Sequence, residues 1–123
     1  MRLLLVDDEA ALARLLAGFL ERQGYEVHAC DSAETALPVF EAGPGAFHAV
    51  IADLTLPGMQ GDEMVRRMLA IAPRMPVIIS SGYPFSAEAY AGFRVSVLQK
   101  PYLPKALAAL LQDLLRPARE AGA

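Results

Sequence analysis

The sequence predicts an α/β domain built on a parallel sheet with helices on both faces. Short apolar runs, of a length typical of buried strands, alternate with segments whose apolar residues recur at helical spacing. Four of these runs are followed by a polar or charged residue. The repeated order of strand and helix implies right-handed crossovers, so the strands are parallel and their ends meet at one edge of the sheet. Open sheets of this kind bind ligands at that edge, and we expect one functional site there.

The first strand and the first helix are expected to follow one another directly. The apolar run at residues 3–6 predicts the strand, and leucine and phenylalanine residues at helical spacing predict a helix that Gly24 is placed to end. Asp8 or Glu9 is expected to cap this helix. Residues 25–29 alternate between apolar and polar types, which predicts the second strand.

The second helix is expected to begin with a capping box formed by Asp31 and Glu34, and to continue to about residue 40. Pro38 lies inside this pattern. It is expected to kink or shorten the helix, because a proline in a helix interior costs about 3 kcal/mol. A Gly-Pro-Gly turn follows at residues 43–45.

Two more strands are predicted on either side of a third helix. The apolar run at residues 49–52 predicts a strand that ends at an aspartate. Methionine, valine and leucine residues between 64 and 69 mark the helix, which Pro73 stops. The run at residues 77–79 then predicts the fourth strand, which leads into two serines.

The last part of the chain contains a weak helix, a strand and a strong helix. Residues 86–91 are long enough only for a short helix, and residues 95–99 predict the fifth strand. Pro104 suits the first turn of a final helix with a leucine-rich face. We expect one domain over residues 1–116 and a flexible tail over residues 117–123.

Composition limits the classes of protein to which the chain can belong. Apolar residues make up 54% of the 123 residues, which excludes a disordered chain. No stretch reaches the length of about 20 apolar residues that a membrane span needs. The net charge of -3 and the lack of a basic cluster argue against binding to nucleic acid. Because Cys30 is the single cysteine, no internal disulfide can form, and we expect a cytoplasmic domain without membrane contact.

Three carboxylates are expected to meet at the edge of the sheet, namely Asp7, Asp8 and Asp53. Taken singly, acids here are also typical of a helix N-terminus or a turn. Together they repel one another, by about 4 kcal/mol for two charges ~4 Å apart at an intermediate dielectric constant. A divalent cation with oxygen ligands offsets such repulsion, which predicts a Mg²⁺ site. His28 and His48 are isolated in the sequence and are interpreted as structural, so zinc is not expected.

Asp53 is the best candidate for a nucleophile among these acids. A carboxylate can attack phosphorus and form an aspartyl phosphate. The loop after Asp53 can wrap a metal ion, Lys100 can neutralise charge on phosphoryl oxygens, and a serine hydroxyl can donate a hydrogen bond to one of them. The residues therefore indicate phosphoryl transfer.

Four stretches of this sequence resemble the receiver domain of two-component response regulators. They are residues 5–9 (LVDDE), 50–61 (VIADLTLPGMQG), 76–82 (PVIISSG) and 99–102 (QKPY), in the order and spacing of that family. The resemblance implies a flavodoxin-like fold with the strand order 2-1-3-4-5. Around the last two of them, residues 80–83 (SSGY) and 98–101 (LQKP) are most similar to the receivers at the C-terminus of hybrid histidine kinases.

The resemblance implies roles for residues at the phosphorylation site. Asp53 aligns with the phosphate acceptor, Ser81 with the hydroxyl residue that moves toward the phosphoryl group, and Lys100 with the lysine that pairs with it. Ser80 lies one position early and is expected to point into the flank of the sheet. The bond between Lys100 and Pro101 is expected to be cis.

The resemblance also implies a ligand set for Mg²⁺. Asp8 and Asp53 would be direct ligands, Asp7 would act mainly through a metal-bound water, and Thr55 would offer its backbone carbonyl. One position departs from the family: an aromatic residue that reports phosphorylation often stands three positions before the lysine, and here that residue is Val97.

The expected function is a phosphorylation-controlled switch in a phosphorelay. The domain would take its phosphoryl group from a phosphohistidine on a histidine kinase or phosphotransfer domain, and would catalyse only its own phosphorylation and dephosphorylation. The surface near the fourth and fifth strands and the last helix would then change. The partner is expected to dock on the small-residue face of the first helix, at Ala10, Ala11, Arg14 and Ala17, for which a plain solvated face is the alternative.

Two other functions stay open from the sequence. A degenerate receiver would only bind partner proteins, although the acids, the hydroxyl and the lysine are all present. A phosphatase with an aspartyl nucleophile would commonly carry a second acid two residues after the first, where this chain has Thr55.

Overall fold

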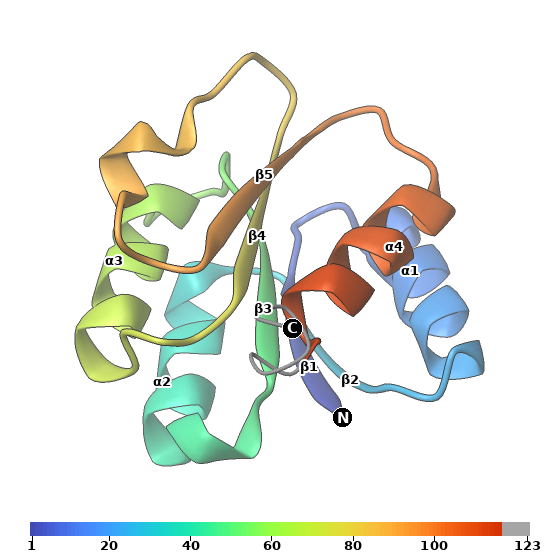
Figure 1. Cartoon of the computed structure of the whole chain (residues 1–123), viewed down its shortest axis with the longest axis horizontal. Coiled ribbons are helices and arrows are strands. Elements are labelled where there is room, and N and C mark those ends of the chain that lie inside the picture. The colour runs from blue at the N-terminus through green and yellow to red at the C-terminus, as the bar shows by residue number, and fades with distance from the viewer. Residues whose placement is uncertain (117–123) are drawn as a thin grey trace.

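A five-stranded parallel sheet forms the centre of the molecule in this computed structural model, which describes residues 1–116 (Figure 1). The predicted tail at residues 117–123 lies outside the described residues. The strands are β1 (Arg2–Val6), β2 (Glu26–Cys30), β3 (Ala49–Asp53), β4 (Val77–Ser81) and β5 (Val95–Gln99). The helices are α1 (Ala10–Arg22), α2 (Ala33–Ala42), α3 (Gly61–Ile71) and α4 (Pro104–Leu114), with 3₁₀ turns η1 (Pro44–Ala46) and η2 (Ala87–Tyr90).

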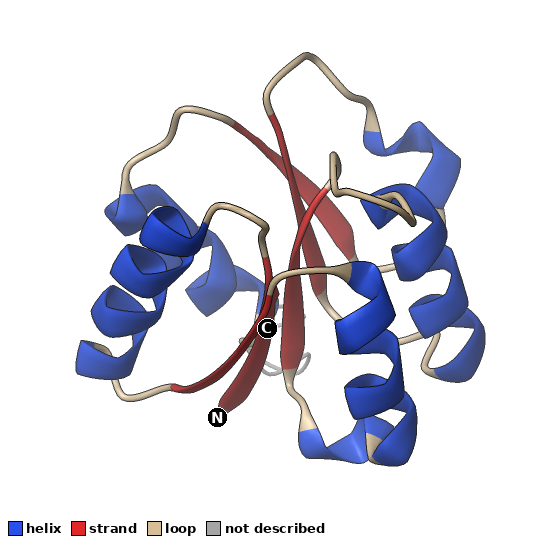
Figure 2. Ribbon diagram, turned by 180° about the vertical axis from the view of Figure 1, so that it is seen from behind, coloured by secondary structure: helices blue, strands red, loops and turns tan. Residues whose placement is uncertain are grey.

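The strand order is β2-β1-β3-β4-β5, and every neighbouring pair is parallel. This order and the fold class agree with the sequence prediction, which is therefore confirmed. The loops that follow the strands gather at the upper end of the molecule in Figures 1 and 2, away from the N-terminus. That end is the edge at which the polar residues were expected to meet.

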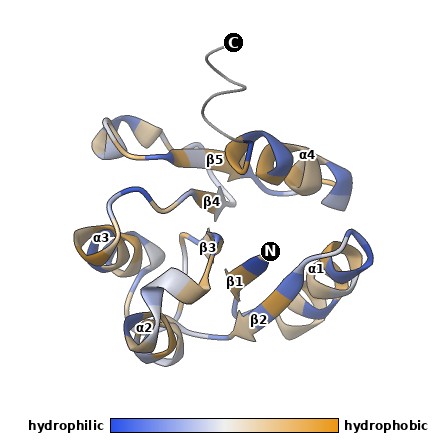
Figure 3. Cartoon of the chain, turned by 60° about the horizontal axis from the view of Figure 1, so that its bottom comes forward, coloured by the Kyte–Doolittle hydropathy of each residue, from blue (hydrophilic) through white to orange (hydrophobic). Residues whose placement is uncertain are grey.

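The helices cover the two faces of the sheet in pairs. Helices α2 and α3 lie on one face, and α1 and α4 lie on the other (Figure 3). Successive residues of β1 serve both faces, since Leu4 packs with the first pair of helices and Leu3 and Leu5 pack with the second. Each inner strand is thus buried on both sides, which explains its unbroken apolar run.

The start of α2 differs from the prediction. Ser32, not Asp31, is the N-cap, and its Oγ accepts a hydrogen bond from the Thr35 N–H at 3.1 Å. The N-cap was therefore predicted one residue too early, and the expected capping box does not form. Glu34 does not turn back to the helix start, because its carboxylate accepts the N–H of Met59 in the loop after β3.

Pro38 does not shorten α2, which runs on to Ala42. Leu37 and Phe40 next to it are buried, and their packing against the core holds this stretch in helical form. Packing in this helix outweighs the unfavourable propensity of one exposed proline. The prediction that Pro38 would shorten the helix was wrong.

The cap of α1 also differs in detail. Glu9 occupies the N-cap position, but its side chain makes no hydrogen bond to the helix. Instead, the Oδ1 atom of Asp7 accepts the N–H of Glu9 at 2.9 Å. The Glu9 carboxylate is therefore free to bind elsewhere at the edge of the sheet.

The link between β4 and β5 contains only the 3₁₀ turn η2, so the predicted weak helix is confirmed as a short element. Tyr90, the last residue of this turn, is buried, and its hydroxyl donates to the carboxylate and the carbonyl oxygen of Asp62 in α3. Four of the five β5 residues are half-buried, whereas all of β3 and β4 are buried. Within residues 1–116, no helix has the length and apolar character to cross a bilayer.

Candidate functional site

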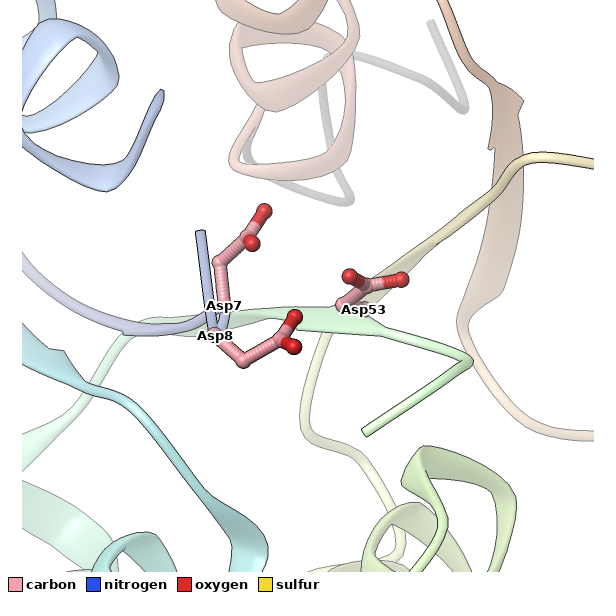
Figure 4. A group of neighbouring side chains, drawn as sticks. All are labelled: Asp7, Asp8 and Asp53. Atoms are coloured by element: carbon pink, nitrogen blue, oxygen red, sulfur yellow. The ribbon is translucent and has the colours of Figure 1, made fainter. Parts of the chain in front are cut away.

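The three predicted carboxylates come together at the expected edge of the sheet. Asp7 and Asp8 follow β1, and Asp53 is the last residue of β3, the strand beside it. Each of the three offers an oxygen atom, and these atoms lie within 4.8 Å of one another. Figure 4 shows the three side chains close together, with the carboxylate of Asp8 directed toward Asp53. Asp7 and Asp53 are buried, and Asp8 is exposed.

Lys100 is the cation of this group. Its Nζ lies 3.1 Å from Oδ2 of Asp53, 3.4 Å from Oδ2 of Asp7 and 3.2 Å from Oε1 of Glu9. The Lys100 backbone N–H also donates to the carbonyl of Ser81 at 2.7 Å, which ties the end of β4 to the lysine. The lysine therefore links residues at the ends of three different strands, β1, β3 and β4.

Glu9 is a member of the site that the sequence did not reveal. It follows the acidic pair directly, but its contact with Lys100 spans 91 positions in the chain. Its exposed carboxylate lines the rim of the site. Its place in an acidic run was the only signal in the sequence, and a helix cap explained that signal equally well.

Burial and neighbouring charges shift the pKa values of Asp7 and Lys100 in opposite directions. Burial raises the pKa of the Asp7 carboxyl by more than the Glu9 N–H and the Lys100 ammonium lower it. Burial of Lys100 favours the neutral amine, but the hydrogen bond to Asp53 and the charges of the acids outweigh it. The pKa of Lys100 is therefore raised, and the ammonium stays charged at neutral pH.

An open pocket of about 300 Å³ lies over Asp53, lined by Asp8, Glu9, Asp53, Thr55, Gly82, Tyr83 and Lys100. The Thr55 N–H donates to Oδ1 of Asp53 at 3.3 Å, which orients the carboxylate from the side of the loop. Gly61 allows this loop to fold tightly, because a Cβ atom there would overlap the carbonyl oxygen of Asp53. The pocket leaves Asp53 accessible to a small ligand.

Ser81 is the predicted site residue whose side chain points elsewhere. It ends β4 and is fully buried, and its Oγ donates to the Tyr83 carbonyl at 2.5 Å and accepts the Tyr83 N–H at 3.2 Å. The hydroxyl makes no hydrogen bond to Asp53. Ser80 pairs in register with Asp53 and is buried in the sheet.

The donor set suits a hard cation such as Mg²⁺. In octahedral Mg²⁺ sites, opposite oxygen ligands lie about 4.2 Å apart, and the three carboxylate oxygens at this edge lie within 4.8 Å of one another. Within residues 1–116, this is the only group of acids, histidines or cysteines with such spacing. His28 packs edge-on against Phe47, and Nδ1 of His48 accepts the Arg2 N–H, so both histidines have structural contacts.

Three further expectations concern the surroundings of the site. The peptide bond between Lys100 and Pro101 is cis, as the resemblance implies. Val97 is half-buried in β5. On α1, the side chains of Ala10, Ala11 and Arg14 are exposed, whereas Ala17 is half-buried against the core.

Comparisons with known proteins agree with this geometry. A family model described as the response regulator receiver domain matches residues 3–112. The chain is 32% identical over 120 residues to the transcriptional regulatory protein FixJ of Bradyrhizobium diazoefficiens, covering 94% of this chain and 57% of that protein. It therefore spans little more than half the length of FixJ.

Solved structures show the same likeness. A response regulator receiver domain protein from Clostridium thermocellum is similar with a TM-score of 0.86 at 25% identity, over 98% of this chain and 96% of the other. The receiver domain of the hybrid histidine kinase CckA has a TM-score of 0.83 at 30% identity, over 94% of this chain and 100% of that one. The match to a hybrid-kinase receiver agrees with the likeness found in the sequence.

Proposed function

Because the chain belongs to the receiver domain family of two-component response regulators, we propose that Asp53 accepts a phosphoryl group from a phosphohistidine. A carboxylate oxygen of Asp53 forms the bond to phosphorus while the bond from phosphorus to the imidazole nitrogen breaks, and its electron pair stays on the imidazole. Positioning and charge stabilisation supply most of the catalysis of such transfers. The observation that carries the proposal is the hydrogen bond between Lys100 and a buried Asp53 under an open pocket.

Mg²⁺ fits this proposal as the cofactor. Asp8, Asp53 and the Thr55 carbonyl would hold the ion, with Asp7 acting through water. Bound there, Mg²⁺ would neutralise negative charge on the phosphoryl oxygens. Lys100 already stands beside Asp53 and can donate to one of those oxygens without crossing the pocket.

Phosphorylation would then be read out through Ser81. The added charge of about -1.5 to -2 favours hydroxyl and ammonium donors around the phosphoryl group. For Ser81 to donate, its hydroxyl must leave the Tyr83 carbonyl, which frees the start of the link between β4 and β5. The surface of β4, β5 and α4 changes with it.

The first experiment incubates the chain with acetyl phosphate and Mg²⁺ and measures the intact mass. We expect one added phosphoryl group, located at residue 53 by peptide mapping after reduction with borohydride. Asp53→Asn removes the acceptor and should take up none. An unmodified wild-type chain would favour the degenerate receiver, which only binds partners, over a switch.

The domain is proposed to act on itself and not on small substrates. A phosphatase with an aspartyl nucleophile needs an acid to protonate the leaving group, and Thr55 offers none at the usual position. No turnover of a generic phosphate ester is expected. Sustained turnover that Asp53→Asn abolishes would establish the phosphatase instead.

The phosphohistidine partner, a kinase or a phosphotransfer domain, is proposed to dock on α1 beside the pocket. Ala10 and Ala11 leave room there for a partner helix, and the exposed Leu15 adds an apolar contact. Such kinases work in the cytoplasm, which is the location we propose for this domain.

The Ala11→Trp variant tests docking because it adds bulk to the exposed face without touching the core. Transfer from a phosphorylated partner that labels the wild type should slow by about tenfold or more, since contact between the two proteins is blocked. Labelling by acetyl phosphate should be unchanged. Equal effects on both donors would reject docking at this face.

A further inference from the structure

The loop between β3 and α3 forms one side of the pocket and is also held from outside the site. Leu54 and Leu56 are buried in the core and anchor the beginning of the loop. Thr55 lies between them and lines the pocket. Farther along, the Met59 N–H donates to Oε2 of Glu34 in α2 at 2.9 Å, across 25 positions of the chain.

Both the loop and the Glu34 carboxylate have features that favour this contact. Gly58 has a φ of 71°, and a Cβ atom at this position would overlap the Glu34 carboxylate. Glycine therefore lets the loop approach the acid closely. The hydrogen bond from Met59 also lowers the pKa of the Glu34 carboxyl, so the acceptor is charged at neutral pH.

The backbone that carries Glu34 is held by core packing. Ala33 and Ala36, on either side of it in α2, are fully buried against the sheet. By contrast, the loop residues Pro57, Gly58 and Gln60 are exposed, and core packing does little to order them. Of the two segments in this contact, α2 is therefore the better ordered, and its Glu34 carboxylate can order the loop.

We propose that Glu34 is a positioning residue that orders the loop carrying Thr55 and thereby sets how tightly the pocket holds a divalent cation. The inference rests on the proposed function in one respect, that the Thr55 carbonyl is a cation ligand. Sequence reasoning had assigned Glu34 to a capping box, a role that the structure gives to no residue. A charged residue in the first turn of a helix can also act through the helix dipole, and the test must separate these roles.

Three variants separate them. Glu34→Ala removes the acceptor, whereas Glu34→Gln removes the charge but keeps an oxygen that can accept the Met59 N–H. Glu41→Ala removes an exposed acid from the far end of the same helix and serves as the matched control.

The first readout is hydrogen exchange of the Met59 amide, followed by NMR without any metal ion. Exchange should become about three- to tenfold faster in Glu34→Ala, stay within about twofold of the wild type in Glu34→Gln, and be unchanged in Glu41→Ala. Unchanged exchange in Glu34→Ala would overturn the proposal. A Gln variant as fast as the Ala variant would do the same, since it would indicate a dipole effect.

The second readout is Mg²⁺ affinity by calorimetry. Binding should weaken by about threefold or more in Glu34→Ala and be restored in Glu34→Gln. Equal affinity in Glu34→Ala and wild type would overturn the positioning role even if the amide exchanged faster. Neither readout uses phosphate, so a failure of Asp53 to take up phosphate would contradict the proposed function and leave this inference standing.

Discussion

Lys100 explains how the acids of the pocket tolerate one another before any cation or phosphate is bound. An ammonium group has three N–H donors, and in this structure they face Asp7, Glu9 and Asp53. The two buried acids, Asp7 and Asp53, share the positive charge of Lys100. Among the described residues, Asp8 makes no ion pair. The lysine therefore has a structural role as well as the proposed chemical one.

A double-mutant cycle tests this role at the level of two residues. Lys100→Met should lower the free energy of unfolding by about 1 to 2 kcal/mol, less than for a fully buried pair, because the Lys100 side chain is 17% exposed. In the Asp53→Asn background the same substitution should cost less, by about 1 kcal/mol, since one of the facing charges is gone. Urea denaturation in the presence of EDTA measures both. Additive effects would show that the pair does not interact.

The site residues differed in how far the sequence could reveal them. Asp7, Asp8 and Asp53 could be predicted because strand ends converge in a parallel sheet. Lys100 could be placed for the same reason. The contacts of Glu9 and Glu34 could not be predicted. From the local sequence, each carboxylate could cap a helix or face solvent, whereas the group that it actually binds lies far away in the chain.

At the scale of elements, apolar patterns predicted all five strands and three of the four helices, since burial of apolar faces determines them. The remaining helix, α2, was predicted from a capping signal. Boundaries were less predictable. Asp31 and Ser32 are adjacent and both suit an N-cap, and only the path of the backbone decides that Ser32 caps α2. Pro38 was misjudged because local propensity does not include the burial of its neighbours.

The turn η2 is the element whose stability depends most clearly on one side chain. Tyr90→Phe removes the hydroxyl that donates to Asp62 and leaves the ring in the core. We expect a loss of about 1 to 2 kcal/mol in the free energy of unfolding and faster hydrogen exchange over residues 82–94. Tyr83→Phe is the control: Tyr83 is 53% exposed, so loss of its hydroxyl should change neither quantity. A stable Tyr90→Phe variant with unchanged exchange would contradict this role.

For the whole molecule, the site exists only while the sheet is intact. Its groups come from the ends of β1, β3 and β4 and from the residue after β5, which no isolated segment brings together. Binding at the site is therefore coupled to global folding, and the unfolded chain cannot reproduce it.

This coupling predicts stabilisation by Mg²⁺. At about a hundredfold excess over its dissociation constant, the ion should add about 2.7 kcal/mol to the free energy of unfolding. Thermal denaturation followed by circular dichroism measures the gain, with sodium chloride of equal ionic strength as the control. Asp8→Asn should lose most of it, because a carboxylate ligand is gone. An equal gain in that variant would place the ion elsewhere.

Gly61 has a consequence for how such a sequence can vary. Because a Cβ atom at position 61 would collide with the main chain of Asp53, we expect selection to keep glycine there for its geometry and not for any chemical role. In a saturation library, position 61 should tolerate no replacement, while the exposed Gly82 across the pocket should accept alanine.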